Sequence, residues 1–136
     1  MNNAETPSKG DSEKITINLG PVDLGQIDLL VREGFYANRS DLIRTAIRQQ
    51  LAQHAEVIRQ GTARQSLVLG LQHLGRAELE AARAAGQRLR LNVLGLARIA
   101  DDVPPELARE VIESVFVLGM LQASPAVKAA LADRMR

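Results

Sequence analysis

The sequence contains no cysteine and no tryptophan, and its aromatic residues are limited to one tyrosine and two phenylalanines. Without cysteine, the chain can form neither disulfides nor thiolate metal sites, which fits a reducing compartment. With so few aromatic residues, any core must be aliphatic. No apolar run approaches the roughly 18 residues of a membrane-spanning helix, and the N-terminus has no signal-peptide segment. These absences predict a cytoplasmic protein with no membrane partner.

Motifs of catalysis and cofactor binding are also missing. The chain has no nucleophile motif, no glycine-rich phosphate loop and only two histidines, His54 and His73. Asp101 and Asp102 precede Val103-Pro104 and fit a loop before a helix better than a general acid–base pair. We therefore predict no enzymatic activity, no catalytic residues, no metal and no cofactor.

Excess positive charge is a third absence. The formal net charge is only +1, and residues 13–60 contain six basic and six acidic residues. Bulk charge therefore does not indicate a nucleic-acid-binding protein. A DNA-binding function has to rest on where individual charges are placed.

The segment 14–19 alternates strictly between polar and apolar residues, which is typical of a half-buried strand. In an extended chain, its two sets of side chains occupy opposite faces: Ile15, Ile17 and Leu19 against Lys14, Thr16 and Asn18. Nothing else in the first 60 residues has a strand pattern, and a single strand leaves its backbone unpaired and its apolar face uncovered. The segment is therefore predicted to pair with the same strand of a second copy.

Two helices are predicted after this strand. Pro21 suits a first helical turn, the apolar residues that follow recur at helical spacing to Glu33, and Gly34 fits a left-handed terminus. Asn38 is a good N-cap for the second helix, and Asp41 can reach back as a capping acid. We expect this helix to run about twenty residues and to end near Gly61.

From Ser66 onward, a short apolar run with a central glycine recurs three times. The runs cover 66–71, 91–96 and 115–120, and their glycines are Gly70, Gly95 and Gly119. Each run precedes a predicted helix, over 76–85, 104–113 and 125–135. This period and composition predict three strand–helix units in a small β/α repeat with a parallel sheet. Isolated glycines in such strands indicate bends or close packing rather than ligands. The alternative is a compact α+β domain in which the spacing is coincidental.

The order strand, helix, Gly34 turn and helix over about residues 13–51 resembles the ribbon-helix-helix family of bacterial repressors, of the MetJ, Arc and CopG type. The resemblance implies an intertwined homodimer in which two copies of the strand pair and enter the major groove of DNA. The base-contacting residues would then be Lys14, Thr16 and Asn18, whose side chains suit the donors, acceptors and methyl groups of the groove. The alternative for these three residues is an ordinary solvated face.

The resemblance to the ribbon-helix-helix family also implies a phosphate-binding site at the start of the second helix. Family members clamp the DNA backbone at this point, which assigns phosphate contacts to Asn38, Arg39 and Ser40. The physical basis is the free N–H groups and the dipole at a helix N-terminus. The alternative is a plain N-cap with a solvated Arg39, and both can hold together.

The predicted α+β chain therefore has four parts: a disordered arm (1–12), a ribbon-helix-helix domain (13–60), a linker (61–65) and a β/α-repeat association domain (66–136). The leading interpretation is a cytoplasmic, nucleoid-associated repressor that binds double-stranded DNA and forms higher homo-oligomers through its C-terminal half. One alternative is an antitoxin whose C-terminal half binds a toxin protein. Another is a purely structural assembly protein without DNA affinity.

Overall fold

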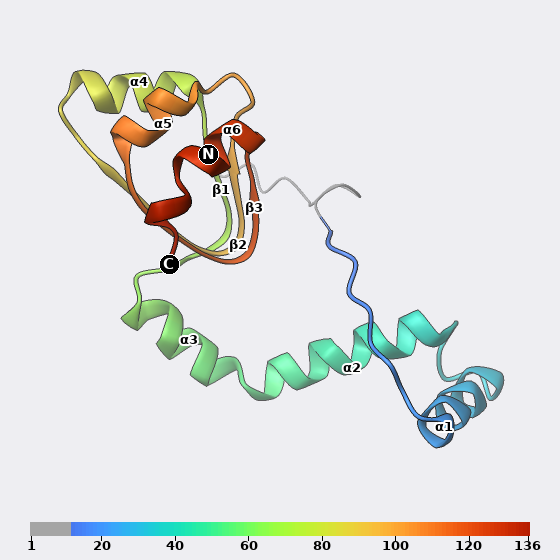
Figure 1. Ribbon diagram of the computed structural model, residues 1–136. Coiled ribbons are helices and arrows are strands. Elements are labelled where there is room, and N and C mark those ends of the chain that lie inside the picture. The colour runs from blue at the N-terminus through green and yellow to red at the C-terminus, as the bar shows by residue number, and fades with distance from the viewer. Residues whose placement is uncertain (1–11) are drawn as a thin grey trace. The chain divides into compact units, whose positions relative to one another are not determined.

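The computed structural model describes residues 12–136, so the arm predicted for residues 1–12 lies outside the described residues except for Ser12. Two compact units make up most of the described chain: Lys14–Gly61 forms the N-terminal unit, and Thr62–Arg136 forms the C-terminal unit. Figure 1 shows an extended segment and helices in the first unit, and a bent sheet covered by helices in the second.

The N-terminal unit is helical after its extended first residues. Its helices are α1 (Pro21–Arg32), α2 (Arg39–Gln53) and α3 (Ala55–Arg64), the last of which continues into the second unit. α1 starts with Pro21 in its first turn and ends at Gly34, whose φ of +87° is left-handed. Phe35 N donates to Leu30 O and Gly34 N to Val31 O, at 3.0 and 3.1 Å, which is the pattern of a Schellman motif. The predicted α1 and its glycine terminus are confirmed.

The single long second helix predicted from Asn38 to Gly61 is wrong. The helix is interrupted at His54, where φ is −101° and ψ is 15°, and α3 begins at the next residue. Gly61 lies inside α3 instead of ending it, and residues 61–64 of the predicted linker are helical. The end of α3 is a second Schellman motif, in which Ser66 takes the left-handed position at φ +53°. A serine there leaves no glycine for the sequence pattern to detect.

The C-terminal unit consists of three strand–helix units in succession, as predicted. In chain order its elements are β1 (Val68–Leu74), α4 (Arg76–Ala84), β2 (Leu89–Ile99), α5 (Pro105–Val111), β3 (Ile112–Gln122), α6 (Pro125–Ala130) and the short 3-10 helix η2 (Ala132–Arg134). The strands form a parallel sheet in the order β1-β2-β3. The register pairs Gly70 with Gly95 and Gly95 with Gly119, so the sequence repeat is a structural repeat.

One face of the sheet carries the core. Alternate strand residues point toward α4, α5 and α6, which lie on the concave side of the bent sheet in Figure 1. The buried core residues are aliphatic: Leu74, Leu79, Ala82, Leu91, Val93, Ala97, Ile99, Val103, Leu107, Ala108, Val111, Ile112, Val115, Val127 and Leu131. This agrees with the scarcity of aromatic residues in the sequence.

Gly95 and Gly119 occupy positions where no side chain fits. Their φ angles are +138° and +122°, a region that L side chains rarely adopt. A Cβ on Gly95 would lie 2.2 Å from the carbonyl oxygen of Gly70, and one on Gly119 would lie 2.1 Å from that of Gly95. Close packing and backbone bending, both predicted from the sequence, therefore apply together.

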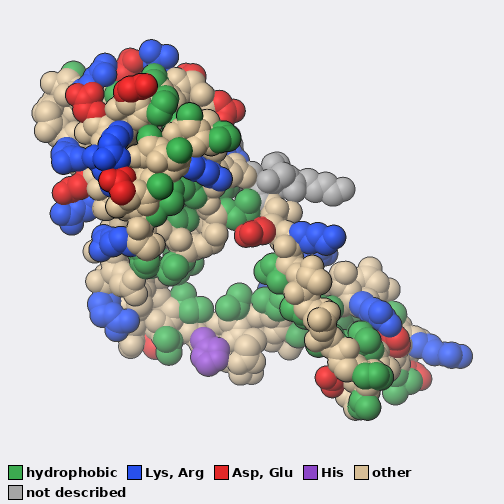
Figure 2. Space-filling view, in the orientation of Figure 1, with side chains coloured by type: hydrophobic (Ala, Val, Ile, Leu, Met, Phe, Trp, Pro, Cys, Tyr) green, Lys and Arg blue, Asp and Glu red, His purple; other side chains and the backbone are tan. Residues whose placement is uncertain are grey.

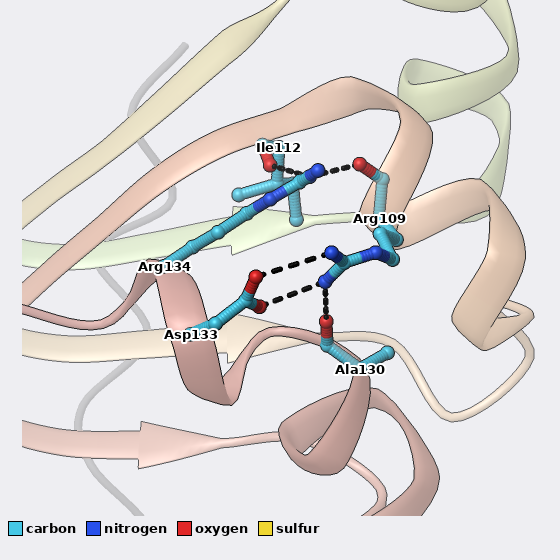
Figure 3. Close-up of polar contacts among 5 residues, drawn as sticks. All are labelled: Arg109, Ile112, Ala130, Asp133 and Arg134. Atoms are coloured by element: carbon cyan, nitrogen blue, oxygen red, sulfur yellow. Dashed lines mark hydrogen bonds and ion pairs between the residues drawn. The ribbon is translucent and has the colours of Figure 1, made fainter.

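A pair of arginines fixes the C-terminal segment to α5 and β3. Arg109 donates from Nη1 to Ala130 O at 2.7 Å and pairs with both carboxylate oxygens of Asp133, at 2.7 and 3.1 Å (Figure 3). Arg134 Nη1 donates to the carbonyl oxygens of Arg109 and Ile112. The hydrogen bonds from Arg109 lower the pKa of the Asp133 carboxyl. The last residues are thereby held against the start of β3.

Replacing Gly95 with alanine should strongly destabilise the C-terminal unit. The left-handed backbone alone costs about 1–3 kcal/mol for a non-glycine residue, and the contact with Gly70 O adds to it. The matched control is Gly61→Ala, because Gly61 is helical and has open space at its Cβ position; alanine there should stabilise by about 0.5–1 kcal/mol. Urea unfolding followed by circular dichroism compares the two. Equal stability of G95A and the wild type would contradict the glycine geometry.

Candidate nucleic-acid interface

The segment before α1 is extended and uncovered. Residues 13–20 form no strand with any other part of the described chain, and all of them are exposed. Ile15 and Ile17 on the apolar face are 82% and 59% exposed. Lys14, Thr16 and Asn18 alternate with them and are exposed as well. Both the polar and the apolar residues of this segment are therefore open to solvent in a single chain, and the strand predicted here has no partner within the described chain.

The helices beside this segment have no closed core within one chain. α1, α2 and α3 contain no buried residue, and hydrophobic side chains are visible on the surface of this unit in Figure 2. The exposed large ones include Val22, Leu29, Leu30, Phe35, Ile47, Leu51 and Val57. A stable domain buries such side chains, each of which gains about 1.5–3 kcal/mol on full burial. This unit therefore presents an apolar surface that one copy of the chain leaves open.

Asn38 caps the start of α2, as predicted. Its Oδ1 accepts a hydrogen bond from the backbone N–H of Asp41 at 2.8 Å. The carboxylate of Asp41 accepts one from Ala37 N at 3.0 Å, so it reaches the residue before the cap instead of the cap itself. The N–H groups of Arg39 and Ser40 lie in the first turn, where a helix supplies no acceptor. They remain able to bind an anion.

Arg39 forms an ion pair with Asp28, which the sequence did not predict. Its Nε and Nη2 donate to the two carboxylate oxygens of Asp28 in α1, at 2.7 and 2.8 Å. Hydrogen bonding to Arg39 lowers the pKa of Asp28, and the same hydrogen bonds raise the pKa of Arg39. The Arg39 side chain is still 55% exposed, so a plain N-cap with a solvated Arg39 is compatible with this bidentate pairing to the carboxylate. Eleven residues separate the two partners, so no helical spacing could indicate the pair.

The family model of the ribbon-helix-helix transcriptional regulators matches residues 10–128. The chain belongs to the ribbon-helix-helix transcriptional regulator family. Members of this family generally bind DNA as dimers and are in general not enzymes. Comparisons with curated proteins and with solved structures gave no match.

The family match extends well beyond the region that the sequence motifs indicated. The resemblance covered about residues 13–51, whereas the match continues through all three strands and into α6. The β/α unit is therefore part of the length that defines this ribbon-helix-helix family.

Among residues 12–136, no three or more His, Cys, Asp or Glu side chains come together in a way that could hold a metal ion. No helix within the same residues is long and apolar enough to cross a membrane.

The Asp28–Arg39 pair should make the stability of the ribbon-helix-helix unit depend on acid pH. A carboxyl whose pKa is lowered by folding contributes stability above its unfolded pKa of about 3.9. That contribution is lost as the pH falls through the lower folded pKa. Asp28→Asn should therefore unfold more easily than the wild type at pH 7, and the difference should shrink toward pH 2. Thermal unfolding at fixed protein concentration measures it, and a difference that is independent of pH would contradict the pairing.

Proposed function

We propose that the protein is a sequence-specific DNA-binding repressor that reads the major groove with a dimeric β-ribbon. The observation that carries the proposal is the extended segment 14–19, which presents a polar row and an uncovered apolar row. Membership of a family of DNA-binding regulators supports the same function. We infer that it represses by occupying its operator.

Dimerisation is the first step of the proposed mechanism. Two copies of the segment pair in antiparallel orientation, so that their backbone groups satisfy each other. Ile15 and Ile17 of both copies then face the open apolar surface of α1 and α2. Burial of side chains that are 82% and 59% exposed in a single copy supplies the driving force. The polar row is left on the outer face of the ribbon.

Base reading follows from that polar row. A two-stranded ribbon fits the major groove, where each base pair presents its own pattern of donors and acceptors. Lys14 donates to guanine, Asn18 pairs in bidentate fashion with adenine, and Thr16 hydrogen-bonds a base or contacts a thymine methyl. The twofold symmetry of the dimer requires an operator with two related half-sites.

Phosphate contacts at the start of α2 fix the register of the ribbon. The backbone N–H groups of Arg39 and Ser40, with the helix dipole, bind a phosphate oxygen. Asn38 holds this turn in place through its bond to Asp41. Arg39 keeps Nη1 for the phosphate, because its hydrogen bonds to Asp28 use Nε and Nη2. The same side chain thus orients α2 against α1 and faces the DNA.

The C-terminal unit joins dimers on neighbouring half-sites in this proposal, which raises apparent affinity through effective concentration. The site of action is the cytoplasm, on the nucleoid. Antitoxins of the family often carry a short C-terminal tail that folds on a toxin. The buried core of this unit argues against such a tail, because residues 66–136 fold on their own contacts. A stable complex with a co-expressed toxin would favour the antitoxin function over the repressor function.

Base reading by Asn18 predicts a sequence-dependent loss on its removal. Operators are first selected from random DNA with the wild-type protein, and binding of Asn18→Ala to the selected and to a scrambled duplex is then titrated. Affinity for the selected site should fall by about 1–3 kcal/mol, roughly 5- to 150-fold, with little change on the scrambled one. Gln49→Ala, an exposed polar change on α2, is the control. Equal losses of N18A on both duplexes would sink base reading by this residue.

A phosphate contact from Arg39 predicts a weaker salt dependence when its charge is removed. Each phosphate contact contributes about 0.9 to the slope of log K against log salt, so Arg39→Gln should flatten the slope by about one unit per site. Arg48→Gln removes the same charge further along α2 and should leave the slope unchanged. Fluorescence anisotropy between 50 and 200 mM salt measures both. An unaltered slope for R39Q contradicts the contact.

A further inference from the structure

Apart from the bridge between Met135 and Val115, the three-stranded sheet pairs with no further strand of the described chain along either edge, and its two edges are related by the internal repeat. β1 pairs only with β2 on one side, and β3 pairs with β2 on the other, among the strands of the described chain. The residues at the strand centres are nearly the same: Val68-Leu69-Gly70-Leu71, Val93-Leu94-Gly95-Leu96 and Val117-Leu118-Gly119-Met120. They also lie in one register. The edge that β1 leaves open therefore resembles the edges that β2 and β3 have already paired.

The glycine contacts all point the same way across the sheet, from each strand to the one before it. At Gly95, the position of a Cβ points at the carbonyl oxygen of Gly70 in the preceding strand, and at Gly119 it points at the carbonyl oxygen of Gly95. Only a hydrogen fits in each of these places. The same position on Gly70 has nothing within 4 Å. In the row formed by Gly70, Gly95 and Gly119, the first glycine, Gly70, therefore has no carbonyl oxygen against its Cβ position.

The other end of this row is its complement. The carbonyl oxygens of Gly70 and Gly95 each lie against the glycine of the next strand. The carbonyl of Gly119 is the equivalent group on the outer edge of β3, where the described chain has no next strand. A strand that pairs with β3 in the same geometry must have glycine opposite Gly119, because a Cβ would again come within about 2.2 Å of an oxygen. Gly70 meets that requirement: it carries the same flanking residues and a left-handed φ of +114°. Gly70 and Gly119 are both exposed.

We propose that β1 of one copy adds in parallel to β3 of another, with Gly70 packed on the carbonyl of Gly119. The contact continues the register of the sheet, so that Leu69 lies beside Leu118 and Leu71 beside Met120. Leu69 is 70% exposed and Leu118 is 47% exposed, whereas Leu94 between them is half-buried by its neighbours. Pairing of the two edges extends this row of leucines. Leu69 and Leu118 then each have a leucine on both sides, as Leu94 does within one chain.

The C-terminal residues leave this part of β3 accessible. Met135 pairs with Val115 in parallel, and Arg136 N donates to Val115 O at 2.9 Å. The guanidinium of Arg136 lies 5.9 Å from the centre of the Phe116 ring. The clamp formed by Arg109 and Arg134 holds this segment at the start of the strand (Figure 3). Beyond Val115, no strand of the described chain other than β2 pairs with β3.

The proposed contact is heterologous, because it joins two different edges. It therefore links copies in succession, in contrast to the twofold pairing of segment 14–19. Under the proposed function, on which this consequence rests, ribbon-helix-helix dimers become joined into rows that occupy consecutive half-sites. The edge contact itself requires no DNA.

Cysteine cross-linking tests the contact directly, because the natural chain has no cysteine. Leu69→Cys and Leu118→Cys are prepared separately in the full-length protein, mixed without DNA and oxidised. Adjacent in-register strands lie about 4.8 Å apart, within disulfide range. Within one chain, β2 separates the two positions by about twice that distance, beyond the roughly 7 Å limit. A disulfide between them therefore joins two copies.

The mixture should give a cross-linked pair of chains, and neither variant alone should do so. Leu71→Cys mixed with Leu118→Cys, two residues out of register, is the matched control and should cross-link at least tenfold less. Homodisulfides of either single variant at the yield of the mixture would overturn the proposal in favour of a symmetric contact. No disulfide in the mixture would overturn it as well.

A second variant separates assembly from folding and from DNA binding. Leu69→Lys places a charge on a side chain that is already largely exposed, so the circular dichroism spectrum should not change. Light scattering of the wild type should give a mass above that of a dimer, rising with concentration, and L69K should remain a dimer. A wild type that stays dimeric at every concentration contradicts the edge contact. DNA titration of the dimer then tests the proposed function separately.

Discussion

An apolar surface that one chain cannot bury governs the N-terminal half of this protein. From residue 12 to the end of α3, no side chain is fully buried, although Ile15, Ile17 and Phe35 are as apolar as any core residue. The Gly34 turn and the Asp28–Arg39 pair help to hold α1 and α2 together, and both are solvent-exposed. Exposed ion pairs stabilise weakly because water competes for them. The proposed dimer resolves this constraint, and the same pairing that covers the isoleucines turns Lys14, Thr16 and Asn18 outward.

The backbone groups of the extended segments are paired differently in the two halves of the chain. Segment 14–19 has no partner in its own chain, and we propose that a symmetric copy supplies one. The C-terminal strands pair among themselves, since each repeat covers its neighbour and the helices bury one face. Within the described chain, the outer edge of β1 and the outer edge of β3 beyond Val115 have no strand partner, and the glycines from Gly70 to Gly119 make these edges complementary in shape. Twofold pairing at one end and head-to-tail pairing at the other is a combination suited to rows of dimers on DNA.

Much of this architecture could be predicted because local chemistry determined it. Pro21 and Gly34 bound α1, Asn38 caps α2, and the recurring Gly70, Gly95 and Gly119 indicated the number of strands, whereas the register that aligns these glycines came from the structure. The break at His54 escaped prediction because no proline or glycine is present there, and the end of α3 escaped because Ser66 replaces the usual glycine. The strands are longer than the apolar runs, since polar residues such as Arg90 and Gln122 continue the ladder. The Asp28–Arg39 contact depends on how two helices pack, which no spacing in the sequence encodes.

Amide hydrogen exchange of residues 14–19 in the free, full-length protein tests the dimeric ribbon most directly. In an antiparallel pair, alternate amides donate across the strands and exchange slowly, whereas those between them face solvent. The account predicts this alternating protection at concentrations that support DNA binding, and its loss on dilution below the dimer dissociation constant. If every amide from Lys14 to Leu19 exchanged at the rate of an unstructured peptide under conditions in which the protein binds its operator, the ribbon and the base contacts assigned to it would be contradicted.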